Sequence, residues 1–341
     1  MAIYDRYLPR GAVERLVRQQ GLGIIQYWPT ASMSGPPWHL YPGYLSEVRG
    51  AALRVDYRWH NATMIERRTW STPVGSVWQE MSYDPGGVGS EHIRKHYIAD
   101  RADYRPLKYL VEHSVLRRNE ETIRAKMRDL GGDGVVWGRL DRSPYQKCLI
   151  ELAGPERFLI DLHEDSAPAL ELMEALAHKQ EEAFAMALDS TVEVLWQPDN
   201  VTSAMTPPQA YRQHCLPVLQ RRAELARQAG KPYLVHMDGQ VRALLPLIAA
   251  SGFDVLESFS LPDIGGNVPL REAQEALPGM AVCPNVPANW AIKPAVEVRE
   301  LVGRLLAERL PGAPMMLQLS EDLPMDCWQT FVPAVMAAVP K

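Results

Sequence analysis

Long apolar runs, paired cysteines and a strong charge of one sign are all missing from this sequence. No stretch of the 341 residues approaches the roughly 20 consecutive apolar residues that a membrane-spanning helix needs, so we expect no membrane partner. The first residues carry several charges and no apolar segment, which argues against a signal peptide. The four cysteines, Cys148, Cys215, Cys283 and Cys327, form no CxxC pair, which predicts reduced thiols in a cytoplasmic protein.

The charge balance and the absence of phosphate-binding motifs narrow the functional classes further. The net charge is −5 with both signs mixed along the chain, and no basic stripe is present, so nucleic acid is not an expected partner. No GxGxxG or P-loop sequence follows an expected strand, which weakens a dinucleotide-binding interpretation. The chain does have a 46% apolar fraction, which is enough for the large core of an α/β domain.

From residue 133 onward, short apolar strands alternate with helical segments. Strands are expected at 134–138, 192–196, 233–236, 253–257, 280–283 and 315–319. Helices are expected at 144–153, 166–189, 207–228, 240–250, 270–276, 295–310 and 327–339. Regular alternation implies right-handed crossovers between parallel strands. With another buried strand expected at 23–28, the count approaches eight, so we predict a closed (β/α)8 TIM barrel, with an open doubly wound sheet as the alternative.

The N-terminal part of the chain differs in character. Residues 2–20 are expected to form a short helix, and residues 103–130 a longer helical segment. Between them, from about residue 30 to 90, the sequence is rich in Gly, Pro, Trp and Tyr. Three runs within it alternate with period two: 53–59, 64–70 and 76–81. These runs predict an insert of antiparallel β-hairpins.

The strand at 233–236 ends on the most informative pair of polar residues in the chain. His236 and Asp238 stand at i and i+2, where side chains of extended chain point the same way. The carboxyl ends of parallel strands are the places where α/β proteins bind ligands. The other expected strand ends contribute further polar and aromatic candidates: Tyr27, Trp196, Asp199, Asn200, Glu257, Cys283, Asn285 and Glu321.

His236 and Glu257 end consecutive strands, so an imidazole and a carboxylate could face each other across the barrel mouth with one further oxygen donor. Imidazole and carboxylates with an open position suit a catalytic zinc ion. The same groups would equally serve as a proton relay without a metal. The remaining candidates divide into two expected roles: catalysis for Asp199, Asn200 and Asp238, and substrate contact for Tyr27, Trp196 and Asn285.

Each candidate also has an ordinary structural interpretation. Asp238 and Glu321 suit helix N-caps, and Glu257 could place its carboxylate at the start of a helix. Asp199 could belong to a turn after a proline. Cys283 is expected to be a core thiol. Both interpretations stay open at this point for the carboxylates.

Several runs of the sequence resemble the uroporphyrinogen decarboxylase superfamily, most clearly from residue 198 to the end. The matching runs are 199–203, 211–217, 230–232, 236–239, 252–255 and 320–324. Upstream, the runs 72–75, 95–98 and 103–104 are similar to the branch of corrinoid-linked methyltransferases. The resemblance implies a single TIM-barrel domain over residues 1–341, with the insert at about 30–90.

The sequence also departs from two branches of that superfamily. Residues 5–9 (DRYLP) only faintly match the Arg-rich RQAGRYLP loop of true uroporphyrinogen decarboxylases. Zinc-dependent methylcobamide:thiol methyltransferases carry His-x-Cys and a C-terminal Cys, where this chain has 236–238 (HMD) and 320–321 (SE). Oxygen donors thus replace thiolates. The replacement argues against a thiol substrate and is compatible with relatives that demethylate methyl ethers.

The resemblance therefore implies a methyltransferase of the corrinoid-dependent O-demethylase type. Zinc held by His236, Glu257 and Glu321, with Asp238 as an alternative ligand, would polarise the ether oxygen of a small aromatic substrate. The methyl group would pass to a corrinoid carried by a partner protein. Two alternatives are a decarboxylase of a tetrapyrrole or polycarboxylate and a non-catalytic corrinoid- or porphyrin-binding protein. A homodimer is also left open.

Overall fold

The computed structural model describes residues 2–4, 12–30, 47–61, 63–83, 92–319, 323 and 327–339. The contacts between residues divide the chain into two units. The first, here called the α/β unit, consists of Met1–Trp28, Glu120–Leu140 and Ser190–Lys341. The second, here called the hairpin unit, consists of Pro29–Asn119 and Asp141–Asp189.

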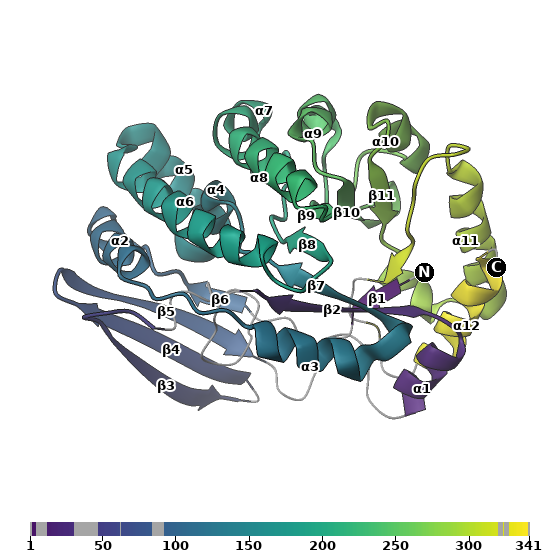
Figure 1. Ribbon diagram of the computed structural model, residues 1–341, viewed down its shortest axis with the longest axis horizontal. Coiled ribbons are helices and arrows are strands. Elements are labelled where there is room, and N and C mark those ends of the chain that lie inside the picture. Colours follow the sequence, from purple (N-terminus) through teal and green to yellow (C-terminus); the bar gives the residue numbers. More distant parts are fainter. Residues whose placement is uncertain are drawn as a thin grey trace. The chain divides into compact units, whose positions relative to one another are not determined.

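A curled parallel sheet forms the centre of the α/β unit (Figure 1). Within the described residues it has eight strands in the order β11-β10-β9-β8-β7-β2-β1-β12. Two isolated parallel bridges, Val282↔Met315 and Asn285↔Gln318, connect the chain around β11 with the chain around β12, which are the two ends of that order. The strands are β1 (Ala2–Tyr4), β2 (Gly23–Pro29), β7 (Gly134–Arg139), β8 (Val194–Gln197), β9 (Tyr233–His236), β10 (Val255–Phe259), β11 (Ala281–Pro284) and β12 (Gln318–Leu319).

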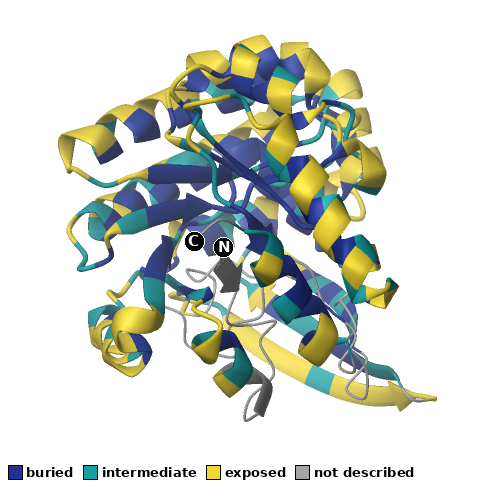
Figure 2. Cartoon of the chain, turned by 90° about the vertical axis from the view of Figure 1, so that its right-hand side faces the viewer, coloured by how far each residue is buried: buried dark blue, intermediate teal, exposed yellow. Residues whose placement is uncertain are grey.

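Helices follow most of these strands and lie on the outer side of the sheet (Figure 1). Figure 2 shows the strands of the sheet as buried and the helices as exposed on their outward faces. Among the described residues, no helix is long and apolar enough to cross a membrane. The helices of this unit are α1 (Ala12–Gln19), α3 (Glu120–Leu130), α7 (Pro208–Ala210), α8 (Leu216–Gln228), α9 (Leu245–Ser251), α10 (Leu270–Ala276), α11 (Ala295–Glu308) and α12 (Trp328–Ala338).

The strands whose side chains are described are largely buried, as expected for a parallel sheet covered by helices. Ile25, Trp137, Trp196 and Leu234, from four neighbouring strands, form a buried cluster between them. Two of these strands approach so closely that a Cβ atom on Gly134 would lie 1.8 Å from the carbonyl oxygen of Ile24. Only glycine can occupy that position without a shift of the backbone.

The hairpin unit contains an antiparallel sheet in the order β3-β4-β5-β6. The three runs predicted as hairpin strands form β3 (Ala52–His60), β4 (Thr63–Thr72) and β5 (Gly75–Tyr83), and each pairs with the next in antiparallel register. The remaining strand is β6 (His92–Lys95). The helices of this unit are α2 (Tyr104–Glu112), α4 (Pro144–Gln146), α5 (Pro155–Glu164) and α6 (Ala167–Leu188).

A buried group of charges anchors the start of the second segment of the hairpin unit. The fully buried Lys147 ammonium lies 2.7 Å from Asp141 and also pairs with Glu151. Arg142 pairs with the same Glu151 carboxylate at 2.9 Å. Two cations and two carboxylates balance in charge here, which is the condition under which buried ionised groups are tolerated.

The structure confirms the predicted mixed α/β fold with a parallel sheet, and it corrects three element assignments. Residues 2–20 do not form one helix, because 2–4 form β1 and pair in parallel with both β2 and β12. The helix expected over 103–130 is broken, because residues 113–115 exchange backbone hydrogen bonds with residues 47–49. Helix α5 was not predicted.

Candidate active site

The centre of the candidate site is a contact between the ends of two neighbouring strands. Glu257 of β10 lies opposite His236 of β9 in the parallel register. The Nδ1 atom of His236 lies 2.7 Å from Oε2 of Glu257. The imidazole and the carboxylate thus lie together at the carboxyl ends of these strands, but in direct contact on neighbouring strands and not across a barrel mouth from each other.

Glu257 is fully buried and its carboxylate accepts hydrogen bonds from three side chains. Oε2 accepts from Nε1 of Trp196 at 2.7 Å in addition to His236, and Oε1 accepts from Nε2 of Gln318 at 2.7 Å. These donors compensate for the loss of water around a buried carboxylate. They also fix its orientation, so the carboxylate holds the imidazole ring in one position.

The imidazole of His236 reaches the surface on its other side. Its side chain is 15% exposed, and its Nε2 atom lies 3.9 Å from Oδ2 of Asp238, whose side chain is 43% exposed. Burial disfavours the charged ring, but Glu257 and Asp238 outweigh this and raise the pKa of His236 to about 10. The two carboxylates therefore enclose an imidazolium, one from the buried side and one from the solvent side.

The turn after β9 determines where Asp238 lies. The amide of Asn200 donates to the carbonyl of His236 at 2.8 Å, which ties the ends of β8 and β9 together. Gly239 has a φ of 76° and its amide donates to Oγ of Ser260 at 2.8 Å. A positive φ favours glycine, which explains why Gly follows Asp238 at this turn. The i and i+2 pair predicted from the sequence thus keeps both side chains on the same side.

Aromatic rings line the neighbouring strand ends. The rings of Tyr27 and Trp196 lie 4.8 Å apart between centroids, and Trp196 meets the His236 ring edge to face at 5.9 Å. The guanidinium of Arg139, at the end of β7, lies 6.0 Å from the Tyr27 ring. Two predicted substrate-contact residues, Tyr27 and Trp196, therefore lie on the same side of the sheet as His236, next to a cation.

The other predicted residues are placed differently. Asp199 is fully buried and accepts from Nε2 of Gln197 at 2.8 Å. Gln197 in turn accepts from the side chains of Arg222 and Tyr233. Asn285 is buried beside β12, to which it is joined by a bridge at Gln318. Cys283 is buried as predicted, and burial raises the pKa of its thiol.

The donors available to a metal ion are limited by these contacts. Among the described residues, no group of three His, Cys, Asp or Glu side chains could hold a metal. Glu321, the third ligand predicted from the sequence, lies outside the described residues. The Glu257 carboxylate is engaged by three donors. Among the described residues, the metal-ligating groups on the solvent side of this contact are Nε2 of His236 and the carboxylate of Asp238. Histidines that bind a metal through one ring nitrogen commonly donate a hydrogen bond from the other nitrogen to a carboxylate.

Two residues of the site were missed in the sequence. Gln318 lies inside the expected strand 315–319, whereas the candidates were sought at and after the strand ends. Arg139 directly follows the expected strand 134–138 but was not chosen as a candidate. A polar residue within an apolar strand was the available signal for Gln318, since it interrupts the run 315–319 (MMLQL).

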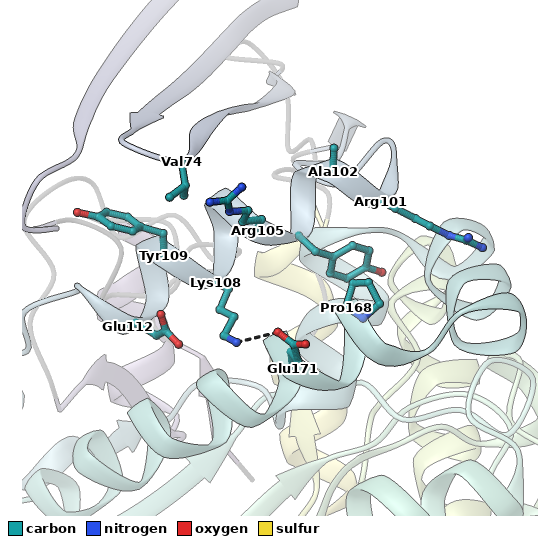
Figure 3. A pocket seen from close by; sticks show the side chains of 10 residues that line it. Val74, Arg101, Ala102, Arg105, Lys108, Tyr109, Glu112, Pro168 and Glu171 are labelled. Atoms are coloured by element: carbon teal, nitrogen blue, oxygen red, sulfur yellow. Dashed lines mark hydrogen bonds and ion pairs between the residues drawn. The ribbon is translucent and has the colours of Figure 1, made fainter.

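A separate pocket of about 700 Å³ lies in the hairpin unit, between α2 and α6. Figure 3 shows Lys108 of α2 paired with Glu171 of α6 among the lining side chains. The Lys108–Glu171 distance is 2.8 Å. Its ten lining residues include neither a histidine nor a cysteine, so this pocket offers no nucleophile or metal ligand comparable to the His236 site.

The comparisons with known proteins concern the fold and the family. A search of curated proteins finds no significant match. A solved methyltransferase from Methanosarcina mazei is 14% identical and has a TM-score of 0.52, with 72% of each chain covered. A solved chitinase from Chromobacterium violaceum is 9% identical and covers 100% of this chain and 99% of its own, with a TM-score of 0.41.

The sequence model of a family described as uroporphyrinogen decarboxylase (URO-D) matches residues 148–340, which is more than half of the chain. The matched region contains His236, Asp238, Glu257 and Gln318, and thus most of the candidate site. The chain belongs to the uroporphyrinogen decarboxylase (URO-D) family.

Proposed function

We propose that the chain is a methyltransferase that takes a methyl group from a small aromatic methyl ether and passes it to a corrinoid carried by a separate protein. The observation that carries the proposal is the line of Glu257, His236 and Asp238, which presents one imidazole nitrogen and one carboxylate, but no thiolate, to a substrate. The upstream motifs that resemble corrinoid-linked methyltransferases support it. We also interpret the two bridges that connect the chain around β11 with the chain around β12 as the closure of a (β/α)8 barrel.

We propose that His236 Nε2 and the Asp238 carboxylate would hold a zinc ion, with Glu321 as the third ligand. Glu257 would then act through the imidazole, because its hydrogen bond at Nδ1 leaves Nε2 as the nitrogen that faces the metal. When bound, the ion would supply Lewis acidity toward the ether oxygen. The buried carboxylate would hold the ring in place and make it a stronger ligand.

The aromatic and cationic side chains next to His236 support an aromatic substrate. The half-buried Tyr27 presents a ring that suits stacking against a second ring, and the buried Trp196 packs behind it at 4.8 Å. Arg139 places a guanidinium beside them, which would attract a negatively charged substituent. A ring that carries both a methoxy group and an acidic group would match this set of side chains.

A metal-free form of the same proposal rests on the raised pKa of His236. A ring whose pKa is raised to about 10 is protonated at neutral pH. It could act as a general acid, giving its Nε2 proton to the oxygen that is left when the methyl group departs. Asp238, which is partly exposed, could then return a proton from solvent to the ring.

Zinc analysis of the purified protein separates the two forms. We expect about one zinc per chain in the natural protein and a large loss in His236→Ala and in Asp238→Asn. His214→Ala is the matched control, because His214 is a partly buried histidine of the same unit and is not part of the site. Stoichiometric zinc that is unaffected by either site variant would contradict the proposed ligands, whereas an activity without zinc would favour the general acid.

The reaction itself is tested with free cob(I)alamin as the acceptor and a panel of aromatic methyl ethers as donors. Methylation of the corrinoid changes its absorption spectrum, which gives a direct rate. We expect a measurable rate that His236→Ala lowers at least about 100-fold, the size of effect expected for one group acting in the transition state. Decarboxylation of uroporphyrinogen together with no methyl transfer would refute the proposal and support the decarboxylase alternative.

A further inference from the structure

Strand β3 is the first strand in the order of the antiparallel sheet, so one of its edges has no neighbour among the described strands. It is nine residues long and exposed over almost its whole length, and it is the long exposed strand at the lower right of Figure 2. In an antiparallel pair, every second residue directs its amide and carbonyl away from the partner strand. The outer edge of β3 therefore carries a row of backbone groups that another strand could pair with.

One face of this strand is apolar, and it is unusually exposed. Leu53, Val55, Tyr57 and Trp59 alternate along that face, and all four are among the large hydrophobic residues that the described structure leaves exposed. Tyr57 is 59% exposed and Trp59 is 64% exposed. Natural proteins seldom leave a long apolar edge strand open, because it pairs readily with other chains. This combination indicates a surface that is covered in the working protein.

We propose that β3 pairs with β3 of a second copy of the chain, antiparallel and across a two-fold axis. An isologous contact requires that the strand be complementary to itself when it is reversed. The charged face shows whether β3 is complementary to its reversed copy, because the charges of Arg54, Asp56 and Arg58 alternate in sign along it. Arg54 already pairs with Asp56, and Arg58 with Glu80 of β5, each at 2.8 Å. All three side chains on β3 are at least 44% exposed, and exposed ion pairs contribute little to stability, so these charges can exchange partners when a second strand arrives.

The alternating charges exclude registers that are centred on a charged residue, because such a residue would lie opposite its own copy. A pair centred on Tyr57 places Asp56 opposite the partner's Arg58, and the reverse, so that two opposite-charge pairs form. The same register places the two Tyr57 rings opposite each other and Val55 opposite the partner's Trp59. A pair centred on Asp56 would instead place Asp56 opposite the partner's Asp56 and Arg54 opposite the partner's Arg58. Like charges directly opposite are destabilising, which excludes this register. A pair centred on Val55 would also match Asp56 with the partner's Arg54, but it would place Trp59 opposite residue 51, outside the strand. Only the register centred on Tyr57 gives both opposite-charge pairs and a partner within β3 for Trp59, so we assign it.

The same argument favours a second copy over a different protein. A foreign strand would need its own charges in matching order, whereas this strand carries both halves of the match. The apolar face contributes aromatic and β-branched cross-strand pairs, which are among the stabilising pairs in antiparallel sheets. Tyr57 and Trp59, the most exposed apolar residues on the strand, are also the ones to which this register gives apolar partners, Tyr57 and Val55 of the second copy.

The oligomeric state measured by analytical ultracentrifugation tests the surface. We expect the full chain to be a dimer at micromolar concentration and Tyr57→Arg to weaken the dimer at least tenfold, since it places two like charges on the axis. Ile292→Lys is the matched control, because Ile292 is 78% exposed and lies in the α/β unit. A monomeric natural chain, or a dimer that Tyr57→Arg leaves intact, would overturn the proposal. Circular dichroism of each variant establishes that it is folded.

Disulfide cross-linking tests the register. In a Cys327→Ser background the other native cysteines are buried, so a cysteine introduced on β3 is the reactive one. Under mild oxidation, Tyr57→Cys is expected to form a covalent dimer through identical positions, because only a residue on the axis meets its own copy. Cross-linking of Val55→Cys in place of Tyr57→Cys would overturn the assigned register. Cross-linking of neither would overturn the strand pairing.

Discussion

Replacement of Glu257 by glutamine tests the central contact of the site. The substitution keeps the shape of the side chain but removes its charge. The glutamine amide cannot accept from Trp196, His236 and Gln318 in the way that two carboxylate oxygens do. We therefore expect the pKa of His236 to fall by at least about two units in metal-free protein, because burial then opposes the charged ring with less compensation.

The structure also gives the size and the pH dependence of the change in stability. The pKa of His236 is raised to about 10 from an ordinary value of about 6.5. At about 1.4 kcal/mol per unit this corresponds to roughly 4 to 5 kcal/mol, in line with the roughly 3 to 5 kcal/mol for breaking a buried pair. Interactions that raise the pKa of a histidine contribute their full amount to the free energy of unfolding below about pH 6.5. This contribution is lost as the pH rises toward 10. The stability difference between the natural protein and Glu257→Gln should therefore be largest near pH 6 and shrink above pH 7.

The pKa of His236 can be followed by NMR of the imidazole nitrogens, and stability by urea unfolding at several pH values. Glu151→Gln is a matched control, because Glu151 is a buried carboxylate paired with Arg142 and Lys147. It should destabilise the protein without changing the titration of His236. An unchanged pKa of His236 in Glu257→Gln, or a stability difference that grows with pH, would refute the reasoning.

Three further predictions follow from the same contacts. Gln318→Leu leaves Oε1 of Glu257 without its donor and should lower the free energy of unfolding by about 1–3 kcal/mol; a change within the error of urea unfolding would contradict this. Gly134→Ala forces a Cβ against the Ile24 carbonyl and should destabilise by about 1–3 kcal/mol or more, whereas the control Gly303→Ala, on a helix with open space, should be neutral or stabilising in the same thermal assay. Zinc affinity, measured by competition with a chromogenic chelator, should rise about tenfold per pH unit between pH 6 and 9, because a proton must leave His236; a pH-independent affinity would argue against His236 as a ligand.

The alternation of strands and helices could be predicted from the sequence because both periodicities are strong. Buried strands such as Tyr233–His236 are short apolar runs that end at polar residues, and the following helices begin near prolines or polar residues. That His236 and Glu257 end consecutive strands could be predicted for the same reason, whereas their direct hydrogen bond was not predicted. Parallel register then brings them together.

The remaining features depend on contacts that the sequence does not encode locally. Residues 2–4 form a strand because they pair between β2 and β12. Gln318 completes the surroundings of Glu257 through a strand that lies far away in sequence. The role of Glu257 as a hydrogen-bond acceptor for three donors could not be foreseen, because two of those donors, Trp196 and Gln318, come from strands that do not neighbour β10.

The position of β1 between β2 and β12 has a consequence for synthesis on the ribosome. β1 emerges long before its second neighbour, β12, has been synthesised. During that interval one edge of β1 has no strand partner. Contacts between segments that are remote in sequence form late and slowly. Two cellular observations would be expected from this delay. Folding would depend on chaperones, and chains truncated before β12 would not accumulate.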